Sequence, residues 1–213
     1  YRGQILVSTY PLIGNYGVPQ KEIEYGLLKY FESDRIHIKG LIISDYSFEY
    51  SHWNARESLS DWLRENDIPG IYGIDTRQLT KIIRERGVML GKIVVEGCDE
   101  PAKFDDPNLR NLAAEVSTPT VETYGDGPLK IVLVDCGCKY NIIRCLINRG
   151  ATVIRVPWDY DFTQIDYDGV MLSNGPGDPQ QCSATIANIK KAMALGKPIF
   201  GICLGNQLLS IAA

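Results

Sequence analysis

Residues 129–158 read LKIVLVDCGCKYNIIRCLINRGATVIRVPW. They contain an apolar run of strand length, a helical segment that ends at a glycine and a second strand-like run. The alternation continues through YDGVMLSNG (167–175), ATIANIKKAMALG (184–196), KPIFGIC (197–203) and LGNQLLSIAA (204–213). Strands that alternate with helices over short, glycine-marked connections predict an α/β fold with a parallel sheet covered on both faces.

Three loops rich in glycine, cysteine and polar residues follow the predicted strands. They are DCGCK (135–139), SNGPGDP (173–179) and GICLGNQ (201–207). The carboxyl ends of parallel strands lie along one edge of a sheet, and ligands of such sheets bind at that edge. We therefore expect one active site where these loops meet.

The most specific motif is the elbow Gly201-Ile202-Cys203-Leu204-Gly205, with Cys203 as the candidate nucleophile. A glycine on each side of the nucleophile is typical of a sharp, strained strand-to-helix turn, because larger flanking side chains would collide there. The helix N-terminus would favour a thiolate on Cys203, and the N–H of Leu204 would be left to donate to an oxyanion. A buried cysteine in a plain tight turn is the structural alternative.

The loop SNGPGDP (173–179) adds a second candidate oxyanion donor. Its glycines would let the backbone approach a ligand, and free N–H groups there can bind an anion. Taken alone, NGPGDP is a turn. Neither phosphate-binding pattern, GxxxxGK[ST] or GxGxxG, is present, so the pairing with the cysteine elbow favours an oxyanion.

The first region, residues 1–97, has a less regular pattern. We predict strands in 3–14 and 36–47, helices over 56–66 and 77–86 (the second capped by Asp75 or Thr76), and a turn into a strand within 86–97. Residues 98–128 predict a linker with a short helix around 108–115, because the segment is punctuated by Pro101, Pro107, Pro119 and Pro128.

Composition excludes several classes of function. The net charge is −4 with the two signs interspersed, so no basic stripe predicts a nucleic-acid partner. No stretch reaches the roughly 18 apolar residues of a membrane helix, and the N-terminus does not resemble a signal peptide. The six cysteines form no CxxC pair and indicate free thiols in a reducing, cytoplasmic compartment. His37 and His52 lack ligand spacing, so we expect no metal site.

A cysteine nucleophile needs a general base, most often histidine. His37 and His52 both lie far upstream, in the irregular first region. The chain starts at Tyr1 without Met and stops at Ala213 inside an apolar helical pattern. We therefore expect a fragment of a longer protein, with the base beyond Ala213.

Taken together, these motifs resemble a known family. SNGPGDP followed by GICLGNQLL, with Cys203 28 residues after Gly175, resembles the class I glutamine amidotransferases. The rest of the chain resembles the small chain of carbamoyl-phosphate synthase, in particular its eukaryotic forms, including the glutaminase region of the multifunctional pyrimidine-pathway protein. The segments that carry this resemblance are TYPLIGNYGVP (9–19), SHWNARESLSDWL (51–63), GIYGIDTRQLTKIIRERG (70–87) and LVDCGCKYNIIRCLINRGATVIRVPW (133–158).

The resemblance implies two domains and a site. Residues 1–127 would be the small-chain N-terminal α/β domain with its linker, which packs against the synthetase. Residues 128–213 would be a flavodoxin-like class I amidotransferase domain, truncated at its C-terminus. The family's functional positions fall on Cys203 (nucleophile that forms a glutamyl thioester), Gly175 and Leu204 (oxyanion hole), and Gly177 and Gln207 (glutamine binding).

The resemblance also implies partners. Ammonia released from L-glutamine would pass through a tunnel to a synthetase, either a separate large subunit or a fused domain, in the pyrimidine or arginine pathway. There it would join bicarbonate and two ATP to make carbamoyl phosphate. ATP and Mg²⁺ belong to that synthetase, and this chain needs no cofactor of its own.

Two departures from the family pattern matter. A serine upstream of Tyr1 and a His…Glu pair downstream fall outside the chain, so the fragment itself would be inactive. Asn206 replaces the histidine of the usual GICLGHQ, a change shared with the ammonia-using branch, although that branch also loses the cysteine. The main alternative is therefore a non-catalytic regulatory or scaffold relative that supports an ammonia-dependent synthetase. A cysteine hydrolase on the same fold is disfavoured by the long first region.

Overall fold

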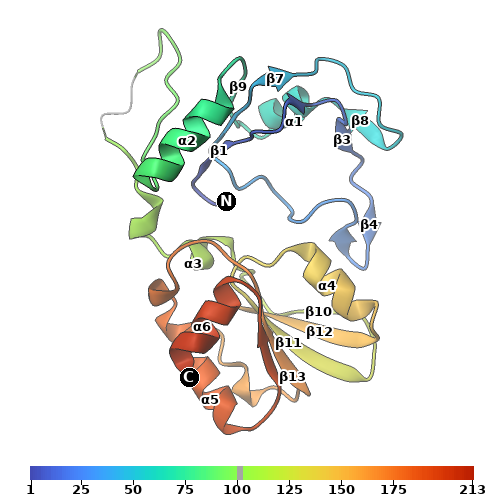
Figure 1. Cartoon of the computed structure of the whole chain (residues 1–213). Coiled ribbons are helices and arrows are strands. Elements are labelled where there is room, and N and C mark those ends of the chain that lie inside the picture. Colours follow the sequence, from blue (N-terminus) through green and yellow to red (C-terminus); the bar gives the residue numbers. More distant parts are fainter. Residues whose placement is uncertain (100–102) are drawn as a thin grey trace. The chain divides into compact units, whose positions relative to one another are not determined.

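The computed structural model describes residues 1–99 and 103–213 and groups the chain into two compact units (Figure 1). The first unit comprises Tyr1–Glu22 and Arg35–Pro107, and the second comprises Ile23–Asp34 and Asn108–Ala213. Pro101 of the predicted linker lies outside the described residues. The division into domains at residues 127 and 128 remains a prediction.

A small parallel sheet forms the centre of the first unit. Its strands are β1 (Ile5–Val7), β6 (Gly40–Ile42) and β9 (Gly70–Ile71), in the order β1-β6-β9. Two-stranded ladders join β2 (Leu12–Ile13) to β7 (Asp45–Tyr46) and β3 (Val18–Pro19) to β8 (Ala55–Glu57). The core of this unit is built on Leu41, Ile43 and Leu63.

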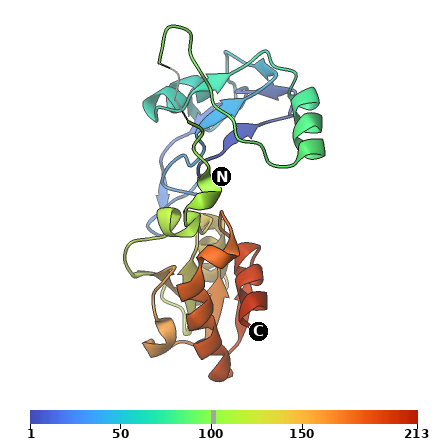
Figure 2. The same cartoon turned by 90° about the vertical axis from the view of Figure 1, so that its left-hand side faces the viewer.

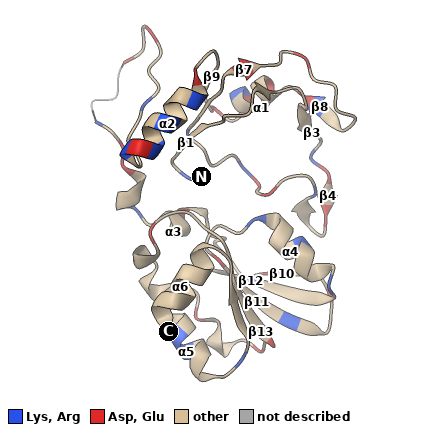
Figure 3. Ribbon diagram, in the orientation of Figure 1, with Lys and Arg blue, Asp and Glu red and all other residues tan. Residues whose placement is uncertain are grey.

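Both predicted helices of the first unit are present. Helix α1 (Leu59–Glu65) follows Ser58, and α2 (Thr76–Arg86) follows Asp75, whose carboxylate accepts a hydrogen bond from the Gln78 N–H at 2.8 Å. This confirms Asp75 as the cap. Basic residues in the last turn of α2 interact favourably with the helix dipole (Figure 3).

The strand predicted within residues 86–97 is wrong. The segment has no strand pairing, and the sheet beside it already ends at β1 and β9. An apolar side chain of this segment packs without strand pairing. Ile93 lies over Gly40, because a Cβ at Gly40 would come within 2.6 Å of Ile93 Cδ1.

The second unit has the predicted α/β architecture. Its sheet has the order β10-β12-β11-β13-β14, in which β10 (Glu122–Tyr124) is antiparallel and the others are parallel. The parallel strands are β11 (Leu129–Asp135), β12 (Ala151–Pro157), β13 (Gly169–Leu172) and β14 (Ile199–Gly201). The helices are α3 (Leu112–Val116), α4 (Tyr140–Ile147), α5 (Ser183–Ala194) and α6 (Leu204–Ala212). Short 3-10 turns occupy Phe162–Gln164 and Pro179–Gln181, and another, Pro107–Leu109, lies where the chain passes from the first unit into the second.

Helix α3 confirms the short helix predicted around residues 108–115. Strand β10 was not predicted, because Glu122–Tyr124 fell within the expected linker. It pairs with β12 and becomes the antiparallel edge of the sheet.

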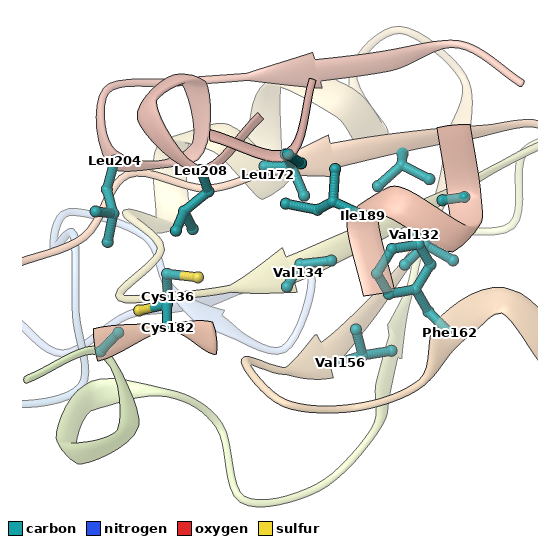
Figure 4. Close-up of a cluster of buried hydrophobic side chains, with 14 of the residues drawn as sticks. Val132, Val134, Cys136, Val156, Phe162, Leu172, Cys182, Ile189, Leu204 and Leu208 are labelled. Carbon is teal, nitrogen blue, oxygen red and sulfur yellow. The ribbon is translucent and has the colours of Figure 1, made fainter. Parts of the chain in front are cut away.

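Alternate residues of β11 point to opposite faces of the sheet, as strand geometry requires. Val132 and Val134 are fully buried in a cluster with side chains from α5 and α6 (Figure 4). Leu133, also fully buried, belongs to a cluster with residues of α4 and of a hairpin. The turned view shows the sheet of this unit with its helices (Figure 2). Both faces are therefore covered, as the sequence pattern predicted.

The hairpin comes from early in the chain. It pairs β4 (Ile23–Glu24) with β5 (Leu27–Leu28), and Leu27 is buried in the α4 cluster. Just after it, Glu32 accepts a hydrogen bond from the Asn141 N–H at 3.1 Å and pairs with Arg144 at 2.7 Å. Residues 23–34 are therefore an integral part of the second unit.

Candidate active site

Three loops follow neighbouring strands of the second unit. Residues 136–139 follow β11, residues 173–178 follow β13, and residues 202–203 connect β14 to α6. Because β11, β13 and β14 are adjacent in the sheet and parallel, these loops share one edge. This is the edge at which we expected the site.

Cys203 is on a strained strand-to-helix turn. Its φ is 52° and its ψ is −110°, a backbone conformation that a residue with a side chain rarely adopts and that costs about 1–3 kcal/mol. The Ile202 N–H donates to Leu172 O at 3.0 Å, and the Gly205 N–H donates to Ser173 O at 3.1 Å. These bonds to the end of β13 hold the turn in place, and they confirm the strained elbow.

The flanking glycines are required by space. A Cβ at Gly201 would lie 2.5 Å from the Asn206 nitrogen, and one at Gly205 would lie 2.3 Å from Leu172 O. Both contacts are with backbone, which cannot move aside as a flexible side chain could. Glycine is therefore required at both positions, as the sequence motif predicted.

Exposure separates Cys203 from the cysteines nearest to it. Burial raises the pKa of the Cys136 and Cys138 thiols, and it raises the pKa of Cys182 to about 11. Cys203 is exposed, whereas Leu204, next in the chain, is packed in the core. The buried thiols are protonated and inert at neutral pH, and Cys203 is open to a substrate.

Two backbone N–H groups near Cys203 are available. Across residues 1–99 and 103–213, the N–H groups of Gly175 and Leu204 donate no hydrogen bond. Leu204 is the first residue of α6, where N–H groups lack partners inside the helix. Gly175 is packed against the elbow, since a Cβ on it would lie 2.7 Å from Leu204 Cδ2. The structure thus places Gly175 against Leu204, the residue that directly follows Cys203.

Gln207 and Gly177, the two residues expected to bind glutamine, lie on different elements of the second unit. Gln207 is exposed on the first turn of α6, and its N–H donates to Cys203 O at 3.1 Å. Gly177 is exposed in the second loop with a φ of 88°, and the nearest atoms to a Cβ there all belong to Leu112 of α3. Cys203 and Gln207 therefore share one helical turn, whereas Gly177 borders α3.

A buried ion pair lies directly beneath the first loop. Asp135, the last residue of β11, is fully buried, and its Oδ2 accepts from Arg155 Nε at 2.9 Å. Burial is the largest single influence on the pKa of Arg155 and would lower it, but the Asp135 charge and hydrogen bonding to Tyr124 and Asp135 together raise that pKa above its usual value. The sequence reasoning missed this pair. A signal was present, since a carboxylate that ends an apolar strand needs a buried partner.

Arg155 also interacts with residues of β10, the antiparallel edge strand of the sheet. Arg155 Nη1 reaches Glu122 Oε2 at 3.0 Å, and the Tyr124 hydroxyl donates to the same oxygen at 2.8 Å. Burial and this bond to Glu122 raise the pKa of Tyr124 to about 12. The tyrosine is therefore protonated at neutral pH and serves as a donor.

Neither histidine belongs to the unit that holds Cys203. His37 and His52 are both in the first unit. The His52 ring is tilted against the rings of Tyr16 and Trp53, and its Nδ1 accepts from the Asn54 N–H at 3.3 Å. Among the described residues, no group of three or more His, Cys, Asp and Glu side chains could hold a metal ion, and no helix is long and apolar enough to cross a membrane.

Comparison with known families agrees with this geometry. Residues 132–213 match the class I glutamine amidotransferases, so the unit that carries Cys203 is of that class. Residues 1–93 match the CPSase domain of the carbamoyl-phosphate synthase small chain. The chain therefore combines a CPSase domain of the carbamoyl-phosphate synthase small chain with a class I glutamine amidotransferase domain.

Curated relatives match over the whole chain. It is 54% identical to the multifunctional protein CAD of Squalus acanthias, of which it covers 10%. It is 52% identical to the mitochondrial carbamoyl-phosphate synthase [ammonia] of Aquarana catesbeiana (14% covered) and 47% identical to the arginine-specific small chain of Saccharomyces cerevisiae (54% covered). The chain thus spans between a tenth and about half of the length of these relatives.

Proposed function

We propose that this chain is the glutaminase part of a glutamine-hydrolysing carbamoyl-phosphate synthase. Cys203 Sγ attacks the side-chain carboxamide of L-glutamine. The new S–C bond replaces the C–N bond, the nitrogen leaves as ammonia after protonation, and water then hydrolyses the glutamyl thioester to glutamate. The observation that supports this most is the exposed cysteine on a strained elbow beside two N–H groups without acceptors.

In this proposal the two free N–H groups have a defined role. When sulfur adds to the carboxamide, its oxygen becomes negative, and the Gly175 and Leu204 amides stabilise that charge. Removal of one such donor lowers kcat by about 10²–10³-fold in other enzymes. Gly177 and Gln207 hold the glutamine substrate.

The general base comes from outside these 213 residues. The unit that holds Cys203 contains no histidine, and the nearby Asp135 is engaged with Arg155. We therefore propose that a His…Glu pair in the longer protein completes the triad and that the 213 residues alone do not turn over glutamine.

The ammonia is used at a different active site. We propose that a synthetase, either the large subunit or a fused domain, binds ATP and Mg²⁺ and converts the ammonia to carbamoyl phosphate. The match of residues 1–93 to the small-chain domain supports this partner. The carbamoyl phosphate then enters the pyrimidine or the arginine pathway. The cytoplasmic compartment also stays a prediction, since some relatives are named mitochondrial.

The thioester itself provides the test. The complete protein is mixed with isotope-labelled glutamine, quenched in acid within milliseconds and digested. The masses of its peptides are then measured by mass spectrometry. We expect a labelled glutamyl group on the peptide that contains Cys203 and none on the Cys98 peptide. A label elsewhere, or no label while ammonia is still released, would contradict the proposal.

A non-catalytic relative that supports an ammonia-dependent synthetase is the second candidate. It is favoured by Asn206, which stands where the family resemblance predicts histidine, and by similarity to chains named for ammonia. The exposed Cys203 on its strained turn argues for catalysis, since a scaffold has no use for that strain.

Asn206→His tests whether the asparagine has altered the pocket. Asn206 is exposed on the first turn of α6, so the larger ring meets no buried neighbour. We expect the KM for glutamine to fall or to stay the same, measured by steady-state kinetics of the complete protein. Ser210→His, one turn further along α6 and also exposed, is the control. A loss of more than about tenfold in kcat/KM, or 1.4 kcal/mol, would show a pocket rebuilt around asparagine.

A further inference from the structure

We propose that Asp135 is a positioning residue for the glutaminase reaction. Its buried carboxylate fixes the loop of residues 136–139, and that loop holds Gly175 and its oxyanion amide in place. The inference rests on the function proposed above, and it concerns a residue that does not touch the substrate.

The Asp135 carboxylate accepts hydrogen bonds on both of its oxygens. Oδ1 of Asp135 accepts from the N–H groups of Gly137 at 2.8 Å and Cys138 at 2.7 Å. Oδ2 accepts from the Thr118 N–H at 2.8 Å and from Arg155, whose Nη2 lies 2.6 Å away. Each oxygen therefore serves at least two donors. Only an ionised carboxylate can accept from all of them, and the Arg155 charge compensates its burial.

The loop of residues 136–139 packs directly against Gly175. A Cβ on Gly175 would lie 2.1 Å from Cys136 O, so the two backbones already touch. Gly137 has a φ of 120°, and a Cβ on it would lie 2.9 Å from Pro176 Cδ and 3.3 Å from Gly175 Cα. The loop that Asp135 holds is thus the surface on which the Gly175 amide rests.

Hydrogen bonds also join the loop of residues 136–139 to the loop of residues 173–178. Asn174 Nδ2 donates to Gly137 O at 3.1 Å, and Asn174 Oδ1 accepts from the Lys139 N–H at 3.2 Å. The Cys136 N–H donates to Ser173 Oγ at 2.9 Å. Ser173 O in turn accepts from Gly205 of the elbow. A change at Asp135 is therefore transmitted to Gly175 through direct contacts.

The structural alternative is that the Asp135–Arg155 ion pair only stabilises the fold. The two roles differ in what they change. A structural role lowers the amount of folded protein but leaves the kinetics of the folded fraction unchanged. A positioning role lowers kcat in protein that is still folded, with little effect on KM, because the oxyanion forms only in the reaction.

The experiment uses the complete protein and the variant Asp135→Asn. Its amide offers one acceptor oxygen and directs an NH₂ group at donors, so the loop must shift. We expect the glutamine-dependent kcat to fall by about 10²-fold, comparable to the loss of one oxyanion donor, with KM within a factor of about three. Synthesis from added ammonia should be unchanged. Asp161→Asn, which removes an ion pair to Lys191 away from these loops, should behave as wild type.

Asn174→Ala provides a second route, because it removes the bonds between the loops and leaves the buried ion pair intact. We expect a kcat loss in the same direction, and this variant decides the matter if Asp135→Asn does not fold. An unchanged kcat in both variants would overturn the inference. If only Asn174→Ala folds, an unchanged kcat in that variant would overturn it. If Cys203→Ser abolishes glutamine use in the same assay, the proposed function stands even then.

Discussion

In the complete protein, Cys203→Ser is expected to abolish synthesis of carbamoyl phosphate from glutamine and to leave synthesis from added ammonia intact. A serine hydroxyl is a far weaker nucleophile than a thiolate at neutral pH. Loss of a triad nucleophile lowers kcat by as much as about 10⁶-fold elsewhere, so a drop of at least about 10³-fold is expected. Cys203 is exposed, so the change should not unfold the protein. Both rates are measured on the same preparation.

Cys98→Ser is the matched control, since Cys98 is also exposed and free but lies in the first unit. Both of its rates should equal those of the wild type. If glutamine-dependent and ammonia-dependent synthesis fell together in Cys203→Ser, the role assigned to Cys203 would be wrong. The protein would then depend on that cysteine for assembly or folding.

The elbow could be predicted because its sequence motif is local. The two glycines and Cys203, with its positive φ, lie within five residues of sequence, although the close approach that requires Gly205 is to Leu172 O on β13. Strand and helix periodicity in residues 129–213 was equally informative, since each element buries one pattern of side chains. The motif therefore predicted that Cys203 and Leu204 lie on the turn.

The parts that could not be predicted depend on contacts distant in sequence. Strand β10 exists because it pairs with β12, and a three-residue run, ETY, has no period to detect. The hairpin at residues 23–28 folds onto α4, more than a hundred residues further along the chain. Asp135 and Arg155 are twenty positions apart and meet only because β11 and β12 are neighbours. Pattern alone does not carry such pairings.

The strand predicted within residues 86–97 fails for a related reason. Its apolar residues do support burial, but burial does not require a ladder partner. Ile93 covers Gly40 from a segment without strand pairing. Hydrophobic runs thus indicate contact with a core more reliably than they indicate a strand.

Gly175→Ala is expected to cause the largest loss among changes that spare the nucleophile. The new Cβ would lie 2.1 Å from Cys136 O and 2.7 Å from Leu204 Cδ2, so the second loop must move away from both. That movement displaces a candidate oxyanion amide. We expect the glutamine-dependent kcat to fall by about 10²–10³-fold and the free energy of unfolding to fall by about 1–3 kcal/mol. Steady-state kinetics and urea unfolding of the complete protein measure the two effects.

Gly91→Ala is the control for adding a methyl group to a glycine. A Cβ there would meet only Ile5 Cδ1, at an ordinary 3.8 Å, so activity and stability should match the wild type. Loss of stability without loss of kcat in Gly175→Ala would mean that the loop packs there but its amide has no part in the reaction. Loss of both kcat and stability in Gly175→Ala would show that packing and catalysis depend on the same contacts. The tight packing that excludes a side chain at Gly175 would then also hold its N–H in place for the reaction at Cys203.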